Sequence, residues 1–353
     1  MIYLFFMEKE ILKNNDLIEE IKGFINEAKE TVAITANSAL TILYWNIGHR
    51  INNEILENKR ADYGQQIIRA LSKRLTEEFG KGWSEKQLRH CLRFAETFKE
   101  KEIVYALSRQ LTWTHFRTLI YIENELSREF YAEMCRLEGW TTRVLNEKID
   151  SMLFERTAIS RKPELQIKKE LKELRENKKI TPDIVFRDPY ILDFLDLEDN
   201  FSEKNLEEAI LKELERFLME LGQGFTFVER QKRMLIDGES YKLDLLFYHR
   251  KLKRLVAIDL KLGRFKAAYK GQMELYLRYI QKHELEPGED SPIGLLLCAE
   301  GNNEQIELLQ IENSGIRIAE YITELPPKEV LQKKLHRLIN TERKRLEQKN
   351  DDK

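Results

Sequence analysis

The stretch LDLLFYHRKLKRLVAIDLK, residues 243–261, decides how the second half of the chain folds. It contains two apolar runs, each with an acid inside it, and short apolar runs on either side of a polar turn predict paired strands. Because side chains alternate along a strand, Asp259 and Lys261 point to the same side, and a hairpin brings Asp244 onto the strand next to Asp259. A carboxylate inside an apolar run needs a charged partner or a metal ion.

The sequence on either side of this stretch alternates between helices and strands. Asp237-Gly238 is a hairpin turn signal, and Gly222 ends the helix that precedes it. The order of helix, three strands, helix and strand is an α/β layer pattern. We assign it to one domain at 181–330. The expected elements are helices at about 203–221 and 265–281 and strands at about 225–235, 241–249, 254–260, 293–298 and 315–321.

Residues 15–155 predict a helical domain. Apolar residues recur every three or four positions, Ser84 is a typical N-cap residue, and Gly139 is a typical helix stop. The segment 156–180 holds nine basic and four acidic residues, which predicts a charged linker or a solvated helix at the domain boundary. Residues 331–353 predict a helical tail with a disordered polar end. Helices are expected at about 15–51, 64–79, 84–97, 114–122, 126–137 and 141–154.

Two of these helices, at about 65–79 and 84–97, have the spacing of a helix-turn-helix unit. The second helix of such a unit places its N-terminal part in the groove of DNA. The alternative is an ordinary helical hairpin whose basic residues are solvated. The residues that the second helix would offer to DNA are Lys86, Gln87, Arg89 and Arg93.

Composition excludes several classes of protein. The 353 residues are enough for about two domains, and the net charge of −2 means that contacts with nucleic acid must come from local patches. Cys91, Cys135 and Cys298 lie far apart, which argues against a disulfide framework and favours a reducing compartment. The apolar start, residues 1–7, lacks the features of a signal peptide, so we expect a cytoplasmic protein.

The two acids of the opening stretch predict a metal site. Asp244 and Asp259 repel each other on adjacent strands, and a divalent cation removes that repulsion. Carboxylate oxygens, with water completing the shell, suit Mg²⁺, which would lower the pKa of a bound water and stabilise charge on a phosphate. Lys261 would hold the attacking water or the phosphoryl oxygens. The alternatives are an Asp244 paired with a nearby cation and a structural ion pair between Asp259 and Lys261.

The chain resembles a known family over most of its length. An acid on a helix, then Asp, then Asp-x-Lys on the next strand resembles the PD-(D/E)XK nuclease superfamily. More narrowly, the chain resembles the YhcG-like family, in which a helical N-terminal domain of uncharacterised function precedes such a nuclease domain. The strings that carry the likeness are LGQGFTFVERQ (221–231), DLLFYH (244–249), GQMELYL (271–277), LYWNIG (43–48), Tyr63-Gly64, LTEEFG (75–80) and EGW (138–140).

The resemblance implies a role for each matching residue. Asp244 takes the place of the first acid, Asp259 of the second and Lys261 of the lysine, while Gln272 and Tyr276 fall on the supporting Gln-x-x-x-Tyr pattern of the following helix. Leu243 stands where the motif has Pro, and Asp259 replaces the commoner Glu. The resemblance also implies a Mg²⁺ cofactor, for which Mn²⁺ can substitute. Without the resemblance, Gln272 is an ordinary helix-surface residue.

The acid of the preceding helix is chosen by helical phase. Glu207 shares its face with apolar residues three, four and seven positions on, whereas Glu208 shares its face with Lys212 and Glu215. An acid on a buried stripe needs a reason to be there. We therefore predict that Glu207 is a metal ligand, in preference to Glu208, Glu213 and Glu215.

Together, these features predict a helical domain followed by a restriction-endonuclease-like αβββαβ domain. The second domain is expected to hydrolyse phosphodiester bonds, with DNA as the expected substrate. The alternatives are a nuclease for RNA or branched DNA, and a catalytically silent nucleic-acid-binding or assembly protein. Lys266 and Lys270 on the helix after the third strand would touch phosphates or else form a solvated face. A homodimer would supply the two sites that cutting two strands needs.

Overall fold

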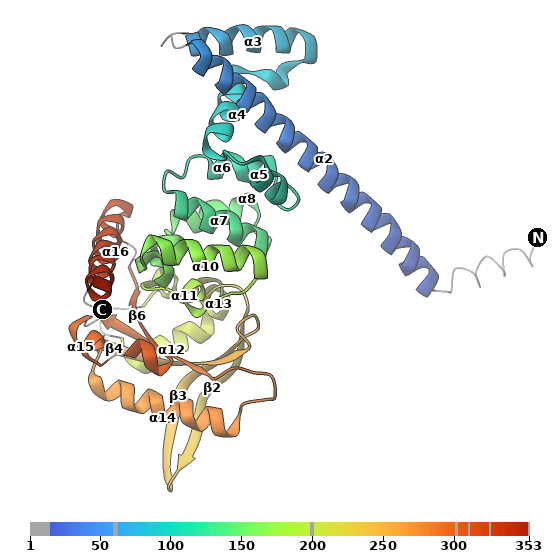
Figure 1. The fold of residues 1–353 in the computed structure, drawn as a ribbon. Helices are drawn as coiled ribbons and strands as arrows, with labels where there is room; N and C mark the ends of the chain where they lie inside the picture. The colour runs from blue at the N-terminus through green and yellow to red at the C-terminus, as the bar shows by residue number, and fades with distance from the viewer. Residues whose placement is uncertain are drawn as a thin grey trace, which may run out of the picture. The chain divides into compact units, whose positions relative to one another are not determined.

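The computed structural model describes residues 15–58, 63–197, 201–300, 303–309, 311–324 and 326–351 (Figure 1). The predictions from the sequence for residues 1–7 and for the last two residues lie outside this range. Contacts divide the chain into two compact units, with the boundary between Asn146 and Glu147. Each unit is described by itself.

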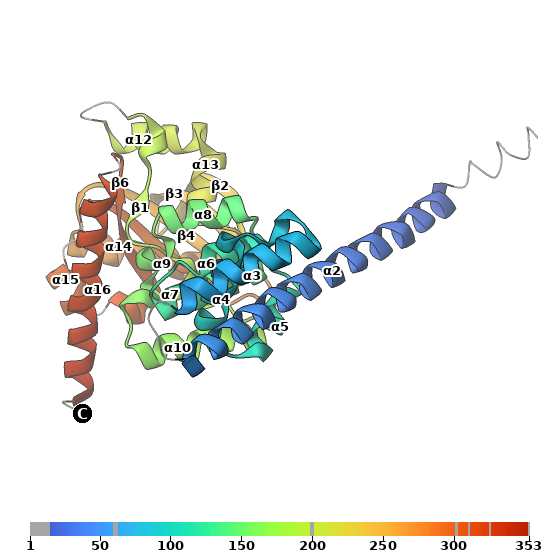
Figure 2. The ribbon, with the colours of Figure 1, turned by 90° about the horizontal axis from the view of Figure 1, so that it is seen from above.

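The first unit is helical over its described residues, as the sequence predicts. Its longest helix, α2, is straight and extends well beyond the other helices of the unit (Figure 2). Helix α2 crosses α4 at Gly48, where an added Cβ would lie 1.8 Å from the carbonyl oxygen of Cys91, so only glycine fits the crossing. The helices are α2 (Asn15–Asn58), α3 (Tyr63–Phe79), η1 (Lys81–Trp83), α4 (Glu85–Thr97), α5 (Lys101–Ser108), α6 (Trp113–Leu119), α7 (Glu125–Glu138) and α8 (Thr142–Asp150), the last of which crosses the boundary.

The capping signals of the first unit act as predicted. The Ser84 side chain accepts a hydrogen bond from the backbone N–H of Gln87 at the start of α4. Gly139 ends α7 in the left-handed region at φ 63°, which glycine adopts without steric cost. Helix α5 was not predicted, because its eight residues are too few to show an apolar period.

The second unit is built around a six-stranded sheet in the order β1-β6-β5-β4-β3-β2. Strands β2, β3 and β4 are antiparallel neighbours, whereas β4, β5, β6 and β1 run parallel to one another. The predicted set of strands is confirmed, and the two-residue strand β1 is added to it. The strands are β1 (Tyr190–Ile191), β2 (Phe225–Ile236), β3 (Glu239–His249), β4 (Arg254–Arg264), β5 (Ile293–Glu300) and β6 (Ile316–Ile322).

Helices cover both faces of this sheet. On one face, α14 packs Met273 and Leu277 against Leu246. On the other face, the ring of Phe217 from α13 contacts that of Phe247, which alternation places opposite to Leu246. The helices of the second unit are α9 (Leu153–Arg156), η2 (Ala158–Arg161), α10 (Glu164–Asn177), α11 (Pro182–Val185), η3 (Asp193–Leu195), α12 (Glu203–Lys212), α13 (Leu214–Leu221), α14 (Ala267–His283), α15 (Asn303–Leu308), η4 (Ile311–Ser314) and α16 (Lys328–Asp351).

The segment 156–180 differs from the charged linker that was predicted. It contains helix α10, whose residues Ile167, Leu171 and Leu174 are fully buried in the second unit. Its high charge hid three apolar residues at helical spacing. The tail at 331–353 is helical up to Asp351 as part of α16, and its apolar residues pack on Met152.

Candidate active site

The two strands that carry the predicted acids separate where the acids lie. The register of β3 and β4 ends at the pair Leu245 and Ile258, so Asp244 and Asp259 occupy the next position, beyond the paired part. The backbone N–H of Leu260 donates to Oδ2 of Asp244 at 2.8 Å. The carboxylate of Asp244 lies close enough to Asp259 to raise the pKa of that acid. The opening between the strands therefore holds the two acids side by side.

Asp259 and Lys261 are buried charges on β4, with 3% and 9% of their surfaces exposed. Nζ of Lys261 lies 2.8 Å from Oδ2 of Asp259. The same ammonium group lies over the ring of Tyr269 on α14, 5.3 Å from its centroid. The lysine is thus held between an acid and an aromatic face, at the open end of β4.

The electrostatics of this pair are unbalanced. Burial raises the pKa of Asp259 to about 7; the Lys261 ammonium opposes this rise and the Asp244 carboxylate adds to it. Burial lowers the pKa of Lys261, but Asp259 more than offsets this and the pKa lies above its ordinary value. A carboxyl group whose pKa is raised although an ammonium group lies 2.8 Å away sits where positive charge is in short supply.

A third acid, Glu207, joins this cluster through Gln231. Glu207 lies on α12 with 7% of its surface exposed. The Gln231 amide donates to Oε2 of Glu207 at 2.6 Å and to Oδ1 of Asp244 at 3.4 Å. Burial raises the pKa of Glu207, and Asp244 adds to the rise. Glu208 is exposed and lies 3.7 Å from Lys204, so helical phase separates the two acids as the sequence indicates.

Gln231 is a site residue that the sequence analysis did not predict. It adopts φ +48° within β2, and the register pairs pass from Arg230 to Lys232 without it. A left-handed residue inside a strand marks a local irregularity that re-aims its side chain. The available signal was its place as the last residue of the string 221–231.

Gln272 and Tyr276 lie one turn apart on α14 and contact each other. The Gln272 amide donates to the Tyr276 hydroxyl, which donates in turn to the backbone carbonyl of Lys242 at 3.0 Å. The predicted Gln-x-x-x-Tyr pair therefore ties α14 to β3, two residues before Asp244. Its contacts are those of a supporting pair.

The donor set has the chemistry of a site for a hard divalent cation. Asp244 and Asp259 supply adjacent oxygen ligands, and the raised pKa values of Asp259 and Glu207 show an excess of acid that a cation would neutralise. Within the part of the chain that the structure describes, no three acidic, histidine or cysteine side chains are arranged around one point. Glu207 is separated from the pair by the Gln231 amide, so two carboxylates form the ready part of the site.

The residues proposed to touch nucleic acid differ in how free they are. In α4, Arg93 donates to the carbonyl of Ile120 at 2.8 Å and lies over the ring of Tyr121, so it has a packing role within its unit. The Gln87 amide lies 3.9 Å from Sγ of Cys91. The remaining positions are exposed or loosely paired: Lys86 is exposed, Arg89 lies 3.7 Å from Glu85, Lys266 is the exposed N-cap of α14, and Lys270 lies 3.3 Å from Glu274.

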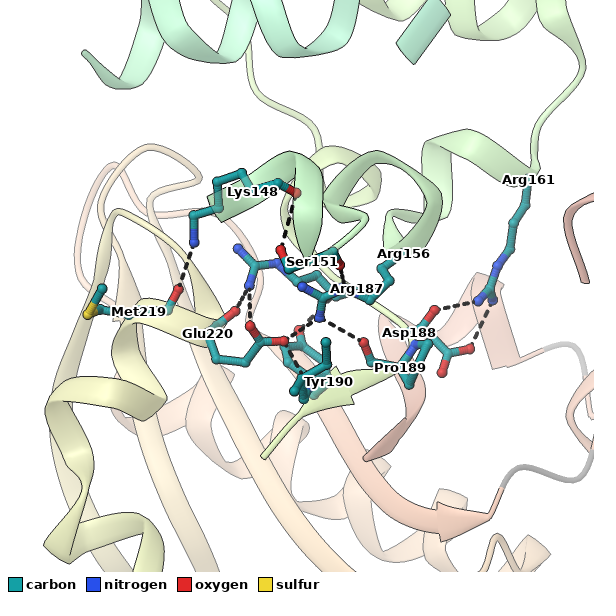
Figure 3. Close-up of polar contacts among 11 residues, drawn as sticks. Lys148, Ser151, Arg156, Arg161, Arg187, Asp188, Pro189, Tyr190, Met219 and Glu220 are labelled. Atoms are coloured by element: carbon teal, nitrogen blue, oxygen red, sulfur yellow. Dashed lines mark hydrogen bonds and ion pairs between the residues drawn. The ribbon is translucent and has the colours of Figure 1, made fainter. Parts of the chain in front are cut away.

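A second cluster of buried charge lies elsewhere in the second unit, where α13 meets the segment before β1 (Figure 3). Two guanidinium groups, of Arg156 and Arg187, bind the single carboxylate of Glu220. Arg156 is 1% exposed and also donates to the carbonyls of Ser151 and Pro189 at 2.8 and 3.2 Å.

This second cluster is electrostatically compensated. Burial raises the pKa of Glu220, but Arg187 and Arg156 more than offset it, so the pKa lies below its ordinary value. Oε1 of Glu220 also accepts the backbone N–H of Ile191 at 2.9 Å. The cluster joins α9, β1 and α13 through hydrogen bonds, and these contacts describe a structural joint.

Two family models match the chain in succession. Residues 20–156 match the DUF1016 N-terminal domain, and residues 183–336 match the YhcG PDDEXK nuclease domain. A protein of Escherichia coli (strain K12) named "Putative nuclease YhcG" is 34% identical over 345 residues, which cover 89% of this chain and 91% of that protein. The chain belongs to the YhcG family. The second unit is its PD-(D/E)XK nuclease domain, as the resemblance implied.

Solved structures with lower sequence identity match part of the chain. A repair endonuclease from Pyrococcus abyssi is 19% identical, with a TM-score of 0.26, over 37% of this chain and 50% of that one. The EndoMS-dsDNA2 complex is also 19% identical, with a TM-score of 0.27, over 37% of this chain and 49% of that one. Among the described residues of this YhcG-family chain, no helix is long and apolar enough to cross a membrane.

Proposed function

We propose that this YhcG-family protein is a Mg²⁺-dependent nuclease that hydrolyses phosphodiester bonds in DNA. The observation that carries the proposal is the opening between β3 and β4. There Asp244 and Asp259 occupy the first position beyond the paired strands, and Lys261 lies 2.8 Å from Asp259. Mn²⁺ is the expected substitute for Mg²⁺, because both prefer oxygen ligands.

Asp244 and Asp259 would hold the metal ion, with Glu207 and the Leu260 carbonyl completing the protein ligands. A cation held there would lower the pKa of a bound water and would offset charge that develops on the phosphate. The Leu260 N–H and the Gln231 amide hold the carboxylate of Asp244 in position by donating to its two oxygens.

Lys261 has the protein's own part in the reaction. Its ammonium group would orient the attacking water and donate to a phosphoryl oxygen as negative charge builds there. Gln272 and Tyr276 fix β3 against α14 through the carbonyl of Lys242, which keeps Asp244 at its distance from Asp259. Because the Lys261 ammonium group is already in place, the protein does not have to reorganise around the phosphate during the reaction.

A cleavage assay tests the proposal. Labelled duplex, single-stranded and branched DNA, and RNA, are incubated with the protein and with Asp244→Asn, in Mg²⁺, in Mn²⁺ or in EDTA. We expect the wild type to cut DNA with either metal and not in EDTA, and Asp244→Asn to bind without cutting. Binding without cutting by both proteins would instead indicate a silent binding module. Preferential cutting of RNA or branched DNA would assign a different substrate.

Two further properties belong to this proposal. A homodimer would place two sites on a duplex, and sedimentation of the protein with and without DNA tests it. The three cysteines are free and buried, which supports a cytoplasmic location. Fractionation of cells that express the full chain tests the location.

A further inference from the structure

The hairpin of β2 and β3 projects beyond the rest of the sheet (Figure 1). Its two strands stay paired from Leu245 out to Ile236 and Glu239, next to the turn. The pairing of β3 with β4 has already ended at Leu245 and Ile258. The outer part of the hairpin is therefore a free two-stranded ribbon that begins at Asp244.

The ribbon carries two basic residues directly opposite each other. Arg233 and Lys242 are register partners, and both are exposed. Like charges in directly opposed positions destabilise a strand pair. Over the described residues, neither side chain forms an ion pair, whereas their neighbour Lys232 lies 3.0 Å from Glu229 and from Glu284. The positive charge of Lys232 is therefore compensated by two acids, whereas the charges of Arg233 and Lys242 are not compensated.

The opposed pair faces the same side as the acids. Lys242 and Asp244 are two residues apart on β3, so alternation places their side chains on the same side of the strand. Arg233 lies directly opposite Lys242 on β2 and shares that side. The Gln231 amide donates to Asp244 and to Glu207, so Glu207 lies on this side as well.

We infer that Arg233 and Lys242 form a phosphate-binding clamp that grips the backbone of the nucleic acid next to the bond that is cut. The inference rests on the proposed nuclease function and adds the surface that holds its substrate. Lys242 is two residues from Asp244, so a backbone lying over the acids passes directly over the clamp. A two-stranded ribbon also fits the major groove of B-DNA. Phosphates would supply the negative charge that the pair lacks.

The salt dependence of binding tests the clamp. The double variant Arg233→Gln/Lys242→Gln is compared with Lys168→Gln/Lys169→Gln, which removes the same charge from the exposed face of α10. All proteins also carry Asp259→Asn, and binding to duplex and single-stranded DNA is measured in EDTA over a range of salt. Loss of two phosphate contacts should reduce the slope of log K against log salt by about 1.8 for duplex or about 1.4 for single strands. The control pair should keep the parent slope.

Melting temperature provides a second readout. If Arg233 and Lys242 had only a structural role, the double variant would have a lower melting temperature than its parent. Removing an opposed like-charge pair should leave the melting temperature unchanged or slightly raised. Lys232→Gln, on the same hairpin, should lower it and keep the parent slope. A clamp variant that keeps the parent slope would overturn this inference. If the protein without the Asp259→Asn change still cuts DNA, the proposed function would stand in that case. A parent protein that binds no nucleic acid, together with a wild type that cuts none, would overturn both.

Discussion

Two clusters of buried charge in the second unit are opposite in kind. In the Glu220 cluster, two guanidinium groups and a backbone N–H surround the carboxylate, and the pKa of Glu220 is lowered. In the Asp259 cluster, Asp244 and Asp259 share one ammonium group, and the pKa of Asp259 is raised to about 7. Burial acts on both acids in the same direction, so the difference comes from their neighbours.

The comparison separates a structural cluster from a functional one. A buried acid that the chain itself compensates stabilises the fold once it is formed, and its loss leaves cations without a partner. A buried acid that the chain leaves uncompensated costs stability and is ready for a ligand of opposite charge. Removing charge should therefore lower stability at the Glu220 cluster and lower activity at the Asp259 cluster.

The largest effect is expected at the structural cluster. Glu220→Gln leaves Arg156 and Arg187 buried without an anion, and breaking such a pair costs about 3–5 kcal/mol. For a unit of the size of 147–353, the melting temperature should fall by roughly 6–20 °C. Cleavage per folded molecule, measured well below the transition, should be retained.

The matched control for that variant is Glu215→Gln, an exposed acid on the same helix. Its melting temperature should stay close to that of the wild type, since exposed substitutions usually change stability by about 0.5 kcal/mol or less. A Glu220→Gln protein as stable as this control would show that the Arg–Glu cluster is not the joint described above.

The next effect is expected at Lys261. Lys261→Met removes the donor that would meet charge on the phosphate, and loss of one such donor typically costs about 10²–10³-fold in rate. Single-turnover cleavage at saturating protein measures this loss. Lys282→Met, an exposed lysine on α14, should cut at the wild-type rate. An equal rate for both variants would remove Lys261 from the mechanism.

A smaller effect is expected at Gln231. Gln231→Asn keeps an amide that tolerates the left-handed conformation but is one methylene too short to reach both Glu207 and Asp244. Residues that orient metal ligands typically contribute about 10–100-fold in metal affinity or activity. The Mg²⁺ concentration for half-maximal cleavage should rise within that range. An unchanged Mg²⁺ requirement would make Gln231 a packing residue only.

The last effect is a pH dependence of opposite sign at the two clusters. In EDTA, Asp259 has a pKa of about 7 in the folded state and about 4 when unfolded. The folded state therefore binds a proton that the unfolded state lacks, and stability falls as pH rises between these values. Glu220 has a lowered pKa, so its contribution is present at neutral pH and is lost as pH falls through that pKa.

Chemical denaturation from pH 2 to pH 8 measures both trends. Asp259→Asn should remove the fall in stability towards neutral pH, and Glu220→Gln should weaken the loss on the acid side. Parallel pH profiles for the two variants would show that the clusters do not differ in the way described.

The sequence was informative where the pattern was local. Alternation placed Asp259 and Lys261 on one side of a strand, the Asp-Gly turn fixed the β2–β3 hairpin, and helical phase separated Glu207 from Glu208. Contacts between residues distant in sequence were not readable. Neither the Gln231 bridge nor the Arg156–Glu220–Arg187 cluster leaves a periodic signal, and α10 was hidden by its charged face.

The most direct test of the account is to measure Mg²⁺-dependent cleavage and the melting temperature of Asp259→Asn on one preparation, beside the wild type. The amide keeps the shape of the carboxyl group and removes its charge. The account predicts that cleavage falls at least about 10³-fold while the melting temperature is unchanged or raised. Cleavage at the wild-type rate, or a melting temperature that falls as far as in Glu220→Gln, would contradict it.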